Sequence, residues 1–109
     1  MTFLAIDAQK NLFSIQKSQL QFEQSLILNR AAIITKDMDR LTSSHAGDDN
    51  YDMEADPIYI MLQREDAYLG TRKDNLDSQL ALIDSAINGM KSLVQNNIKT
   101  SCSLQLLGG

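Results

Sequence analysis

The stretch LDSQLALIDSAINGMKSLV, residues 76–94, decides the fold. Its large apolar residues recur at alternating steps of four and three, which keeps them on one side of an α-helix. The members of this seam are Leu76, Leu80, Ile83, Ile87, Met90 and Val94. Leu62 and Leu69 extend the seam backwards in steps of seven. The spacing therefore predicts a long amphipathic helix that packs along a narrow line.

Small residues occupy the side of this helix that lies roughly opposite the seam. The members of this small stripe are Ser78, Ala81, Ser85, Gly89 and Ser92. Leu82 and Leu93 stand at its edge. The distance between packed helices depends on the side chains at the contact, so a small stripe allows a close approach. We therefore expect a second helix to pack near Gly89.

Residues 3–42 hold a second long helical pattern, and neither Gly nor Pro interrupts the first 46 residues. A heptad line repeats every seven positions: Ile6, Phe13, Leu20, Ile27, Ile34 and Leu41. A neighbouring line holds Ala8, Leu12, Ile15, Phe22, Leu26 and Ile33. Together they span about half of the helix circumference, whereas a helix on one core needs a stripe of about 100°. This width favours packing against several partners over the alternative, in which one edge is exposed.

Residues 43–56 break the helical pattern and predict an acidic connecting loop. From Asp37 to Asp56 there are seven acids and one Arg, which gives a local charge of −6. Asp56 suits the N-cap of the following helix, and Pro57 suits its first position. Two helices joined by a short loop pack as antiparallel neighbours. The predicted fold is all-α: one hairpin domain over residues 1–109, with helices at about 3–42 and 57–100.

Residues 101–109 depart from both helical patterns. The segment SCSLQL, residues 101–106, mixes small, polar and apolar residues with a hint of the two-residue period of a strand. We expect a short extended tail here. A lone strand has no partner within two helices, so adding to a strand of another subunit, continuing the helix and disorder all stay open.

Composition excludes several classes of function. Hydrophobic residues make up 43% and charged residues 22%, as in folded proteins. A net charge of −4, with no basic cluster longer than Arg72–Lys73, predicts no nucleic-acid partner. The longest apolar run, Ile58–Leu62, is too short to span a membrane. No classical signal peptide is visible, which leaves a cytoplasmic location or export by a signal-independent machine.

No set of residues predicts a reaction, a metal or a cofactor. His45 lacks the orienting acid and the rigid surroundings that a catalytic triad needs. The acids between Asp48 and Glu54 alternate as in an EF-hand loop, but Met53 stands at the required Gly and Tyr59 at the final Glu. Cys102 has no second cysteine, which favours an inert residue. We therefore predict a non-enzymatic protein without metal or cofactor.

The predicted hairpin has more apolar surface than two helices bury. Each helix of a pair covers one face, and such simple chains are marginal unless something covers the rest. The expected hairpin core consists of Phe13, Leu20, Ile27, Ile34, Leu76, Leu80, Ile83, Ile87, Met90 and Val94. The expected assembly surface consists of Ser78, Ala81, Ser85, Gly89 and Ser92 with Leu12, Ile15, Phe22 and Leu26.

This excess of apolar surface predicts a structural subunit that associates with copies of itself. Open-ended contacts produce a filament and closed symmetry produces a discrete bundle, and the sequence leaves both open. The alternative is an adaptor or chaperone-like module that holds a helix of another protein on the wide face of residues 3–42.

A family resemblance points in the same direction. It is carried by residues 56–98, through Asp56-Pro57, Leu62-Gln63, Tyr68, Arg72 and Gln95-Asn96-Asn97-Ile98. In these positions the chain resembles the needle subunits of type III secretion systems. It differs from them in its longer acidic loop, its longer first helix and its additional tail. The resemblance implies a secreted or assembling structural subunit.

Overall fold

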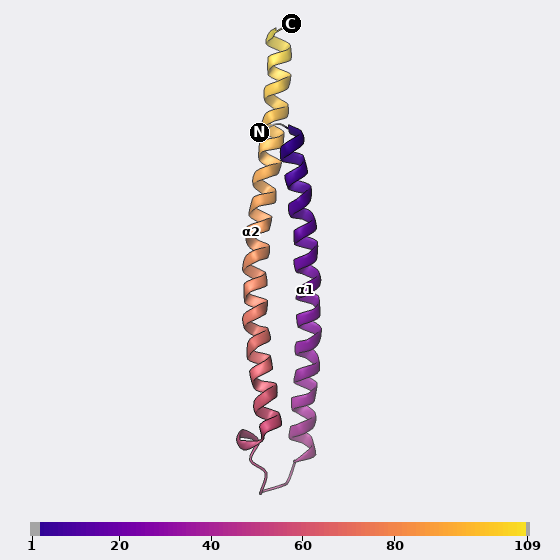
Figure 1. Cartoon of the computed structure of the whole chain (residues 1–109), viewed down its shortest axis with the longest axis vertical. Coiled ribbons are helices and arrows are strands. Elements are labelled where there is room, and N and C mark those ends of the chain that lie inside the picture. Colours follow the sequence, from indigo (N-terminus) through magenta and orange to yellow (C-terminus); the bar gives the residue numbers. More distant parts are fainter. Residues whose placement is uncertain (1–2, 109) are drawn as a thin grey trace. The chain divides into compact units, whose positions relative to one another are not determined.

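A computed structural model describes residues 3–108, and side chains over residues 4–96, 98 and 99. It contains helix α1 (Phe3–Ser44), the 3₁₀ helix η1 (Met53–Ala55) and helix α2 (Pro57–Gly108) (Figure 1). No strand occurs within the described residues. The predicted fold, an all-α antiparallel hairpin of two long helices, is confirmed.

Helix α1 ends two residues later than predicted, at Ser44. The Ser44 hydroxyl donates a hydrogen bond to the Leu41 carbonyl at 2.9 Å, which extends the last turn. Gly47 then adopts a φ of 81°, a left-handed conformation that glycine reaches without a steric penalty. The connecting segment therefore begins at His45, and Gly47 turns the chain away from the helix axis.

The start of α2 agrees with the sequence. Asp56 has an extended backbone with φ −73° and ψ 118°, and its Oδ1 accepts a hydrogen bond from the Ile58 amide at 2.9 Å. This is the N-cap arrangement, and Pro57 occupies the first helical position, where no amide hydrogen is needed. The predicted cap of α2 is confirmed.

The prediction of an extended tail at residues 101–109 is wrong. Helix α2 continues through residues 101–108, and residue 109 lies outside the described residues. Residues 101–107 contain neither Gly nor Pro, so each residue added to an existing helix contributes a further backbone hydrogen bond. A β-strand needs a neighbouring strand for its backbone hydrogen bonds, and the described part of the chain offers none. Continuing the helix, one of the three open possibilities, is what occurs.

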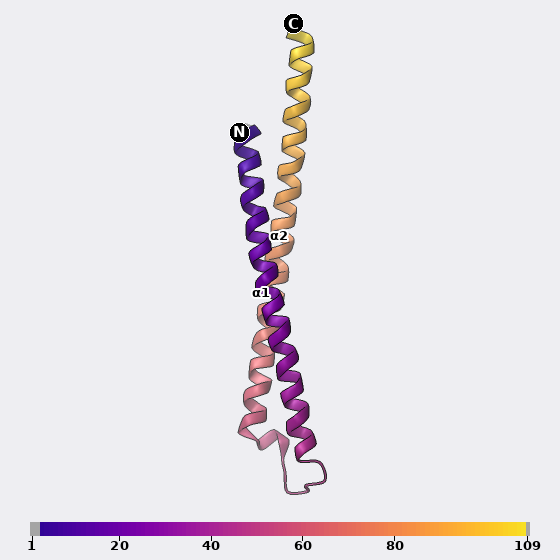
Figure 2. The same ribbon diagram turned by 90° about the vertical axis from the view of Figure 1, so that its right-hand side faces the viewer.

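Contacts divide the chain into two compact units. We call Phe22–Asp77 the loop unit, because it contains the end of α1, the connecting segment and the start of α2. We call residues 1–21 with 78–109 the terminal unit. In each unit a stretch of α1 packs against a stretch of α2 that runs in the opposite direction (Figures 1 and 2).

The core of each unit is a single row of apolar side chains. The buried members are Ile27, Ile34, Leu69 and Leu76 in the loop unit, and Ile6 and Ile87 in the terminal unit. The α1 members are separated by multiples of seven residues, as the heptad line predicts. Glu23 and Arg30 occupy the positions four before and three after Ile27, where a wider core would need apolar residues. The row therefore stays narrow.

Ion pairs flank the apolar row of the loop unit. The Arg72 guanidinium donates to Glu23 Oε1, from Nε at 3.0 Å and also from Nη2. Arg30 donates to both carboxylate oxygens of Glu65, at 2.7 and 3.1 Å. The hydrogen bond from Arg30 lowers the pKa of the Glu65 carboxyl. Because partly exposed ion pairs contribute little to stability, we infer that these pairs chiefly fix the register of α1 against α2.

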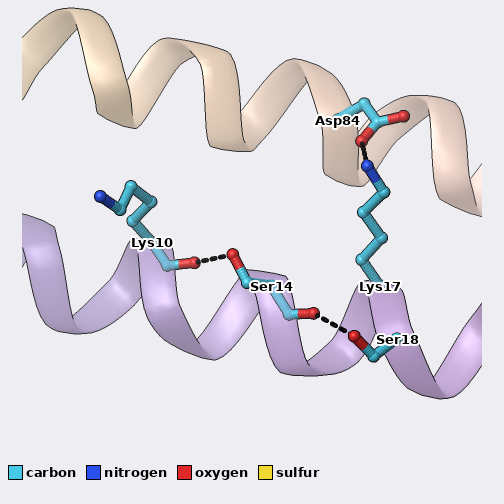
Figure 3. Close-up of polar contacts among 5 residues, drawn as sticks. All are labelled: Lys10, Ser14, Lys17, Ser18 and Asp84. Carbon is cyan, nitrogen blue, oxygen red and sulfur yellow. Dashed lines mark hydrogen bonds and ion pairs between the residues drawn. The ribbon is translucent and has the colours of Figure 1, made fainter.

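The terminal unit has its own link between the two helices. Lys17 Nζ lies 2.7 Å from Asp84 Oδ1, which joins α1 to α2 (Figure 3). The hydroxyls of Ser14 and Ser18 instead donate to α1 itself, to the carbonyls of Lys10 and Ser14, each at 3.1 Å. The Lys17–Asp84 ion pair therefore links the two helices within this unit.

Two adjacent isoleucines of α1 test the single-row core. Ile34 is 0% exposed and Ile33 is 48% exposed, although both lie in the same helix and the same unit. We expect Ile34→Ala to lower the free energy of unfolding by about 2–5 kcal/mol, because it leaves a cavity. Ile33→Ala, the matched control, should cost less than about 1 kcal/mol at low protein concentration. Urea denaturation followed by circular dichroism measures both, and equal losses would contradict this core.

Candidate assembly surface

All ten residues of the expected hairpin core are buried or half-buried. Four of them are buried: Ile27, Ile34, Leu76 and Ile87. The other six are half-buried: Phe13, Leu20, Leu80, Ile83, Met90 and Val94. Ile6 and Leu69 are buried as well, although neither was in the expected core. Both stand in the seven-residue lines, so the spacing that identified the other core residues also marks these two.

All nine residues of the expected assembly surface are exposed. On α2 they are Ser78, Ala81, Ser85, Gly89 and Ser92. On α1 they are Leu12, Ile15, Phe22 and Leu26, with exposed fractions of 55%, 57%, 66% and 52%. Neither group has a covering element among the described residues.

The exposed apolar residues of α1 follow one another at helical spacing. We call Leu12, Ile15, Phe22, Leu26 and Ile33 the outer stripe. Successive members are three, seven, four and seven residues apart, which keeps them on one side of the helix. Leu12 and Ile15 belong to the terminal unit, and the other three belong to the loop unit. Each unit thus presents apolar side chains that the hairpin itself leaves in water.

Exposed apolar side chains outnumber buried ones across the described residues. Thirteen large apolar side chains are exposed, against six that are buried. Five of the exposed ones retain about two thirds of their accessible surface or more: Leu4 at 77%, Leu82 at 72%, Met61 at 69%, and Phe22 and Tyr68 at 66% each. Single exposed apolar residues are ordinary, but groups of them mark interaction surfaces. The outer stripe is therefore a candidate interaction surface.

The space beside Gly89 is open. A Cβ atom placed on Gly89 would meet no heavy atom within 4 Å. The close helix approach expected at this residue therefore does not occur within the described part of the chain. Glycine in a helix costs about 1 kcal/mol relative to alanine, and packing inside the terminal unit does not offset this cost.

The connecting segment is ordered by side chains rather than left as a free acidic loop. The rings of His45 and Tyr51 stack with centroids 3.7 Å apart and planes inclined by 9°. The Tyr51 hydroxyl donates to Asp56 Oδ2 at 2.7 Å. Burial, followed by this hydrogen bond and the Asp56 charge, raises the pKa of Tyr51 to about 12. The Tyr51 hydrogen bond and the Ile58 amide lower the pKa of Asp56.

Two acidic side chains of this segment accept hydrogen bonds from backbone amides. Asp48 Oδ1 accepts a hydrogen bond from the Asn50 amide at 3.0 Å, and Asp52 Oδ1 accepts one from the Glu54 amide at 3.1 Å. Within the part of the chain that the structure describes, no group of three or more His, Cys, Asp or Glu side chains is arranged to hold a metal ion. These acids therefore shape the turn and cap η1.

An open groove lies where α1 ends and α2 begins, within the loop unit. Its volume is about 390 Å³. It is lined by Asp37, Arg40, Leu41 and Ser44 of α1 and by Ile58 and Leu62 of α2. Leucine and isoleucine side chains form its walls, and a carboxylate and a guanidinium provide charge. Spacing alone did not indicate this groove, because its two walls are separated by the connecting segment.

Comparisons with protein-family models, with curated proteins and with solved structures gave no match. The resemblance to needle subunits thus stays a prediction. The described helices include none that is both long and apolar enough to cross a membrane.

Alkaline titration tests the arrangement around Tyr51. Its pKa of about 12 lies above the ordinary value of 10.0, so the folded segment favours the neutral phenol. This stabilisation is fully present below pH 10 and is lost as the pH rises towards 12. In Tyr51→Phe, the phenolate absorbance that appears near pH 12 should be missing. Tyr68→Phe, which alters an exposed tyrosine, should retain it, and the opposite pattern would refute the assignment.

Proposed function

We propose that this protein is a non-enzymatic structural subunit that assembles with copies of itself. The contact surface is formed by the outer stripe of α1 and the small stripe of α2. The observation that carries this proposal is the excess of exposed over buried apolar side chains, thirteen against six, in the described residues. Groups of exposed apolar side chains mark interaction surfaces, and the outer stripe supports the proposal on this ground.

The chain offers surfaces of complementary size. The outer stripe presents large side chains such as Ile15 and Phe22, whereas the small stripe presents Gly89 with open space beside it. A bulky residue of one copy fits against a small residue of the next, as ridges of one helix pack into grooves of another. Because one chain carries both surfaces, a second copy is a suitable partner.

Such a contact is favourable only if both copies bury apolar side chains in it. Covering one half-exposed Leu, Ile or Phe gains about 1 kcal/mol. Association costs at least about 4 kcal/mol in lost translational and rotational freedom. The outer stripe has two members in the terminal unit and three in the loop unit, so neither portion meets this cost alone. Assembly should therefore depend on protein concentration and use side chains from both partners.

Two further features bear on the form of assembly. The resemblance of residues 56–98 to needle subunits supports an open-ended assembly and export by a signal-independent machine. The alternative, an adaptor or chaperone-like module, uses the same outer stripe to hold a helix of a different protein. An adaptor of this kind is a monomer or dimer by itself, which separates it from a self-assembling subunit.

Substitution of Gly89 tests the small stripe. Gly89→Leu fills the open space beside α2 while favouring helix, so we expect normal helicity but at least a tenfold loss of assembly in light scattering. Gly70→Leu is the matched control, because Gly70 is also an exposed helical glycine with no heavy atom near its Cβ direction. The control should assemble normally. If Gly89→Leu assembles like the unaltered chain, the small stripe is not a contact surface.

A further inference from the structure

The outer stripe of α1 runs directly beside the charged residues that pair with α2 in the loop unit. Leu26 lies three residues after Glu23 and four residues before Arg30. Ile33 follows Arg30 by three residues, and Phe22 precedes Leu26 by four. Side chains at these spacings are neighbours on the surface of a helix. The apolar stripe and the two charged residues of α1 therefore lie next to each other.

Helix α2 repeats this arrangement with its own exposed apolar residues. Glu65 lies four residues after Met61 and three residues before Tyr68. Arg72 follows Tyr68 by four residues. Met61 and Tyr68 are 69% and 66% exposed. Glu23 raises the pKa of the Arg72 guanidinium most strongly, and Tyr68 also raises it, which agrees with a position of Tyr68 beside this group.

Both apolar rows belong to one face of the loop unit. Arg72 donates a hydrogen bond to Glu23, and Arg30 donates one to Glu65, so the charged residues of the two helices meet along a single flank. Each apolar row borders this flank on its own helix. We call the members of both rows the two-row face: Phe22, Leu26, Ile33, Met61 and Tyr68.

The four charged groups within the two-row face alternate in sign. Along α1, Glu23 precedes Arg30 by seven residues, which is about 10 Å in a helix. Along α2, Glu65 precedes Arg72 by the same interval. Because the helices run in opposite directions, each carboxylate has a guanidinium beside it on the other helix and another along its own helix. The four side chains are between 37% and 50% exposed, so a partner can reach this pattern.

This alternating pattern is complementary to a copy of itself. When two such faces meet through a two-fold axis in the contact plane, each carboxylate of one copy faces a guanidinium of the other. The match holds whether the axis runs along the helices or across them. Complementary charges suppress wrong partners and fix the register of a contact. The charge pattern therefore favours a second copy of this chain as the partner.

The two-row face also exposes about as much apolar surface as a dimer contact uses. A standard interface covers about 800 Å² on each partner, of which about 450 Å² is apolar. An aromatic side chain covers about 150–250 Å² when buried, so Phe22 and Tyr68, each 66% exposed, offer about 200–330 Å² together. Leu26, Ile33 and Met61, at 52%, 48% and 69% exposure, supply most of the remainder.

We propose that the two-row face of the loop unit binds the same face of a second copy through a two-fold axis. This inference rests on the proposed self-assembly and specifies its contact in the loop unit. The contact uses the same surface on both copies, so it closes at a dimer in which four helices surround one apolar core. The small stripe lies wholly within the terminal unit, together with Leu12 and Ile15, and these residues remain for contacts between dimers.

Exchange of the two charges within one ion pair tests this contact. The first variant carries Glu23→Arg with Arg72→Glu, and the second carries Arg30→Glu with Glu65→Arg. Each exchange keeps opposite charges paired between α1 and α2 and leaves the net charge at −4, so the fold and the overall repulsion stay the same. On this flank, α1 of the first variant carries two guanidinium groups and α2 two carboxylates. The second variant has the reverse pattern.

The dimers that the two variants form, alone and mixed, give the decisive measurement. If α1 of one copy faces α1 of the other, each variant alone opposes like charges, and its dimer dissociation constant should rise about tenfold or more. An equal mixture then restores the dimer. If α1 faces α2, each variant dimerises alone and the mixture forms few mixed dimers. Native mass spectrometry with one variant isotope-labelled counts mixed dimers. Mixed dimers in statistical proportion, with unaltered dissociation constants, overturn the proposal.

Two leucines of α1 test the apolar part of the contact. Leu26 is 52% exposed and Leu28 is 48% exposed, and both belong to the loop unit. Leu28 lies one turn after Gln24, whose side chain donates to Asp77 across the opposite flank. Leu26→Gln should raise the dimer dissociation constant about tenfold or more, whereas Leu28→Gln, the matched control, should leave it unchanged. Equal effects of the two substitutions overturn the assignment of this face.

The unaltered chain and Gly89→Leu separate this contact from the small stripe. If the unaltered chain is monomeric at every concentration, the proposed self-assembly and the two-fold contact both fail. If it assembles while the exchange variants and their mixture behave like the unaltered chain, only the two-fold contact fails. Gly89→Leu alters the terminal unit alone, so sedimentation should show assembly that stops at the dimer. A Gly89→Leu chain that keeps its helicity but is monomeric overturns the two-fold contact.

Discussion

The rest of this structure depends on one constraint: a helix paired with a single other helix buries only one narrow side. In each unit the buried residues form one row, and Leu76 and Ile34 at its centre are fully covered. Each of them gains about 1.5–3 kcal/mol from burial. Nothing in a hairpin covers the other sides of α1 and α2, so large apolar residues such as Phe22 stay in water. We propose that association with further copies covers that remaining surface.

The polar residues beside the row explain how so narrow a core specifies one pairing. A strictly apolar seam allows helices to slide by a heptad, because every seventh residue is equivalent. The pairs Glu23–Arg72 and Arg30–Glu65 remove that equivalence, since a shifted register separates both. Partly exposed ion pairs add little stability. Their contribution is therefore to alignment, while the apolar row supplies the favourable free energy.

Much of the fold could be predicted because it follows from local periodicity and capping. The 76–94 seam, the heptad line of α1 and Asp56 ahead of Pro57 each indicate helix over many residues or through a defined hydrogen bond. The prediction for residues 101–109 is wrong because the pattern of six residues, 101–106, does not distinguish a helix from a strand. The described part of the chain has no strand that could pair with this segment, and helix α2 continues instead. The stacking of His45 on Tyr51 and the groove beside Leu41 depend on how the connecting segment folds back between the two helices. The spacing of residues along the sequence does not predict that conformation. The exposure of the outer stripe could be predicted because the apolar face of α1 is wider than one partner helix covers.

Sedimentation velocity of the purified chain over a wide dilution series tests the central claim most directly. If one buried row leaves the hairpin incomplete, the mass should exceed that of the 12.2 kDa monomer at high concentration. It should fall towards the monomer mass on dilution, and thermal stability should fall with it because folding and assembly are linked. A chain that sediments as a monomer at every concentration, with a melting temperature independent of dilution, would show that the hairpin is complete by itself.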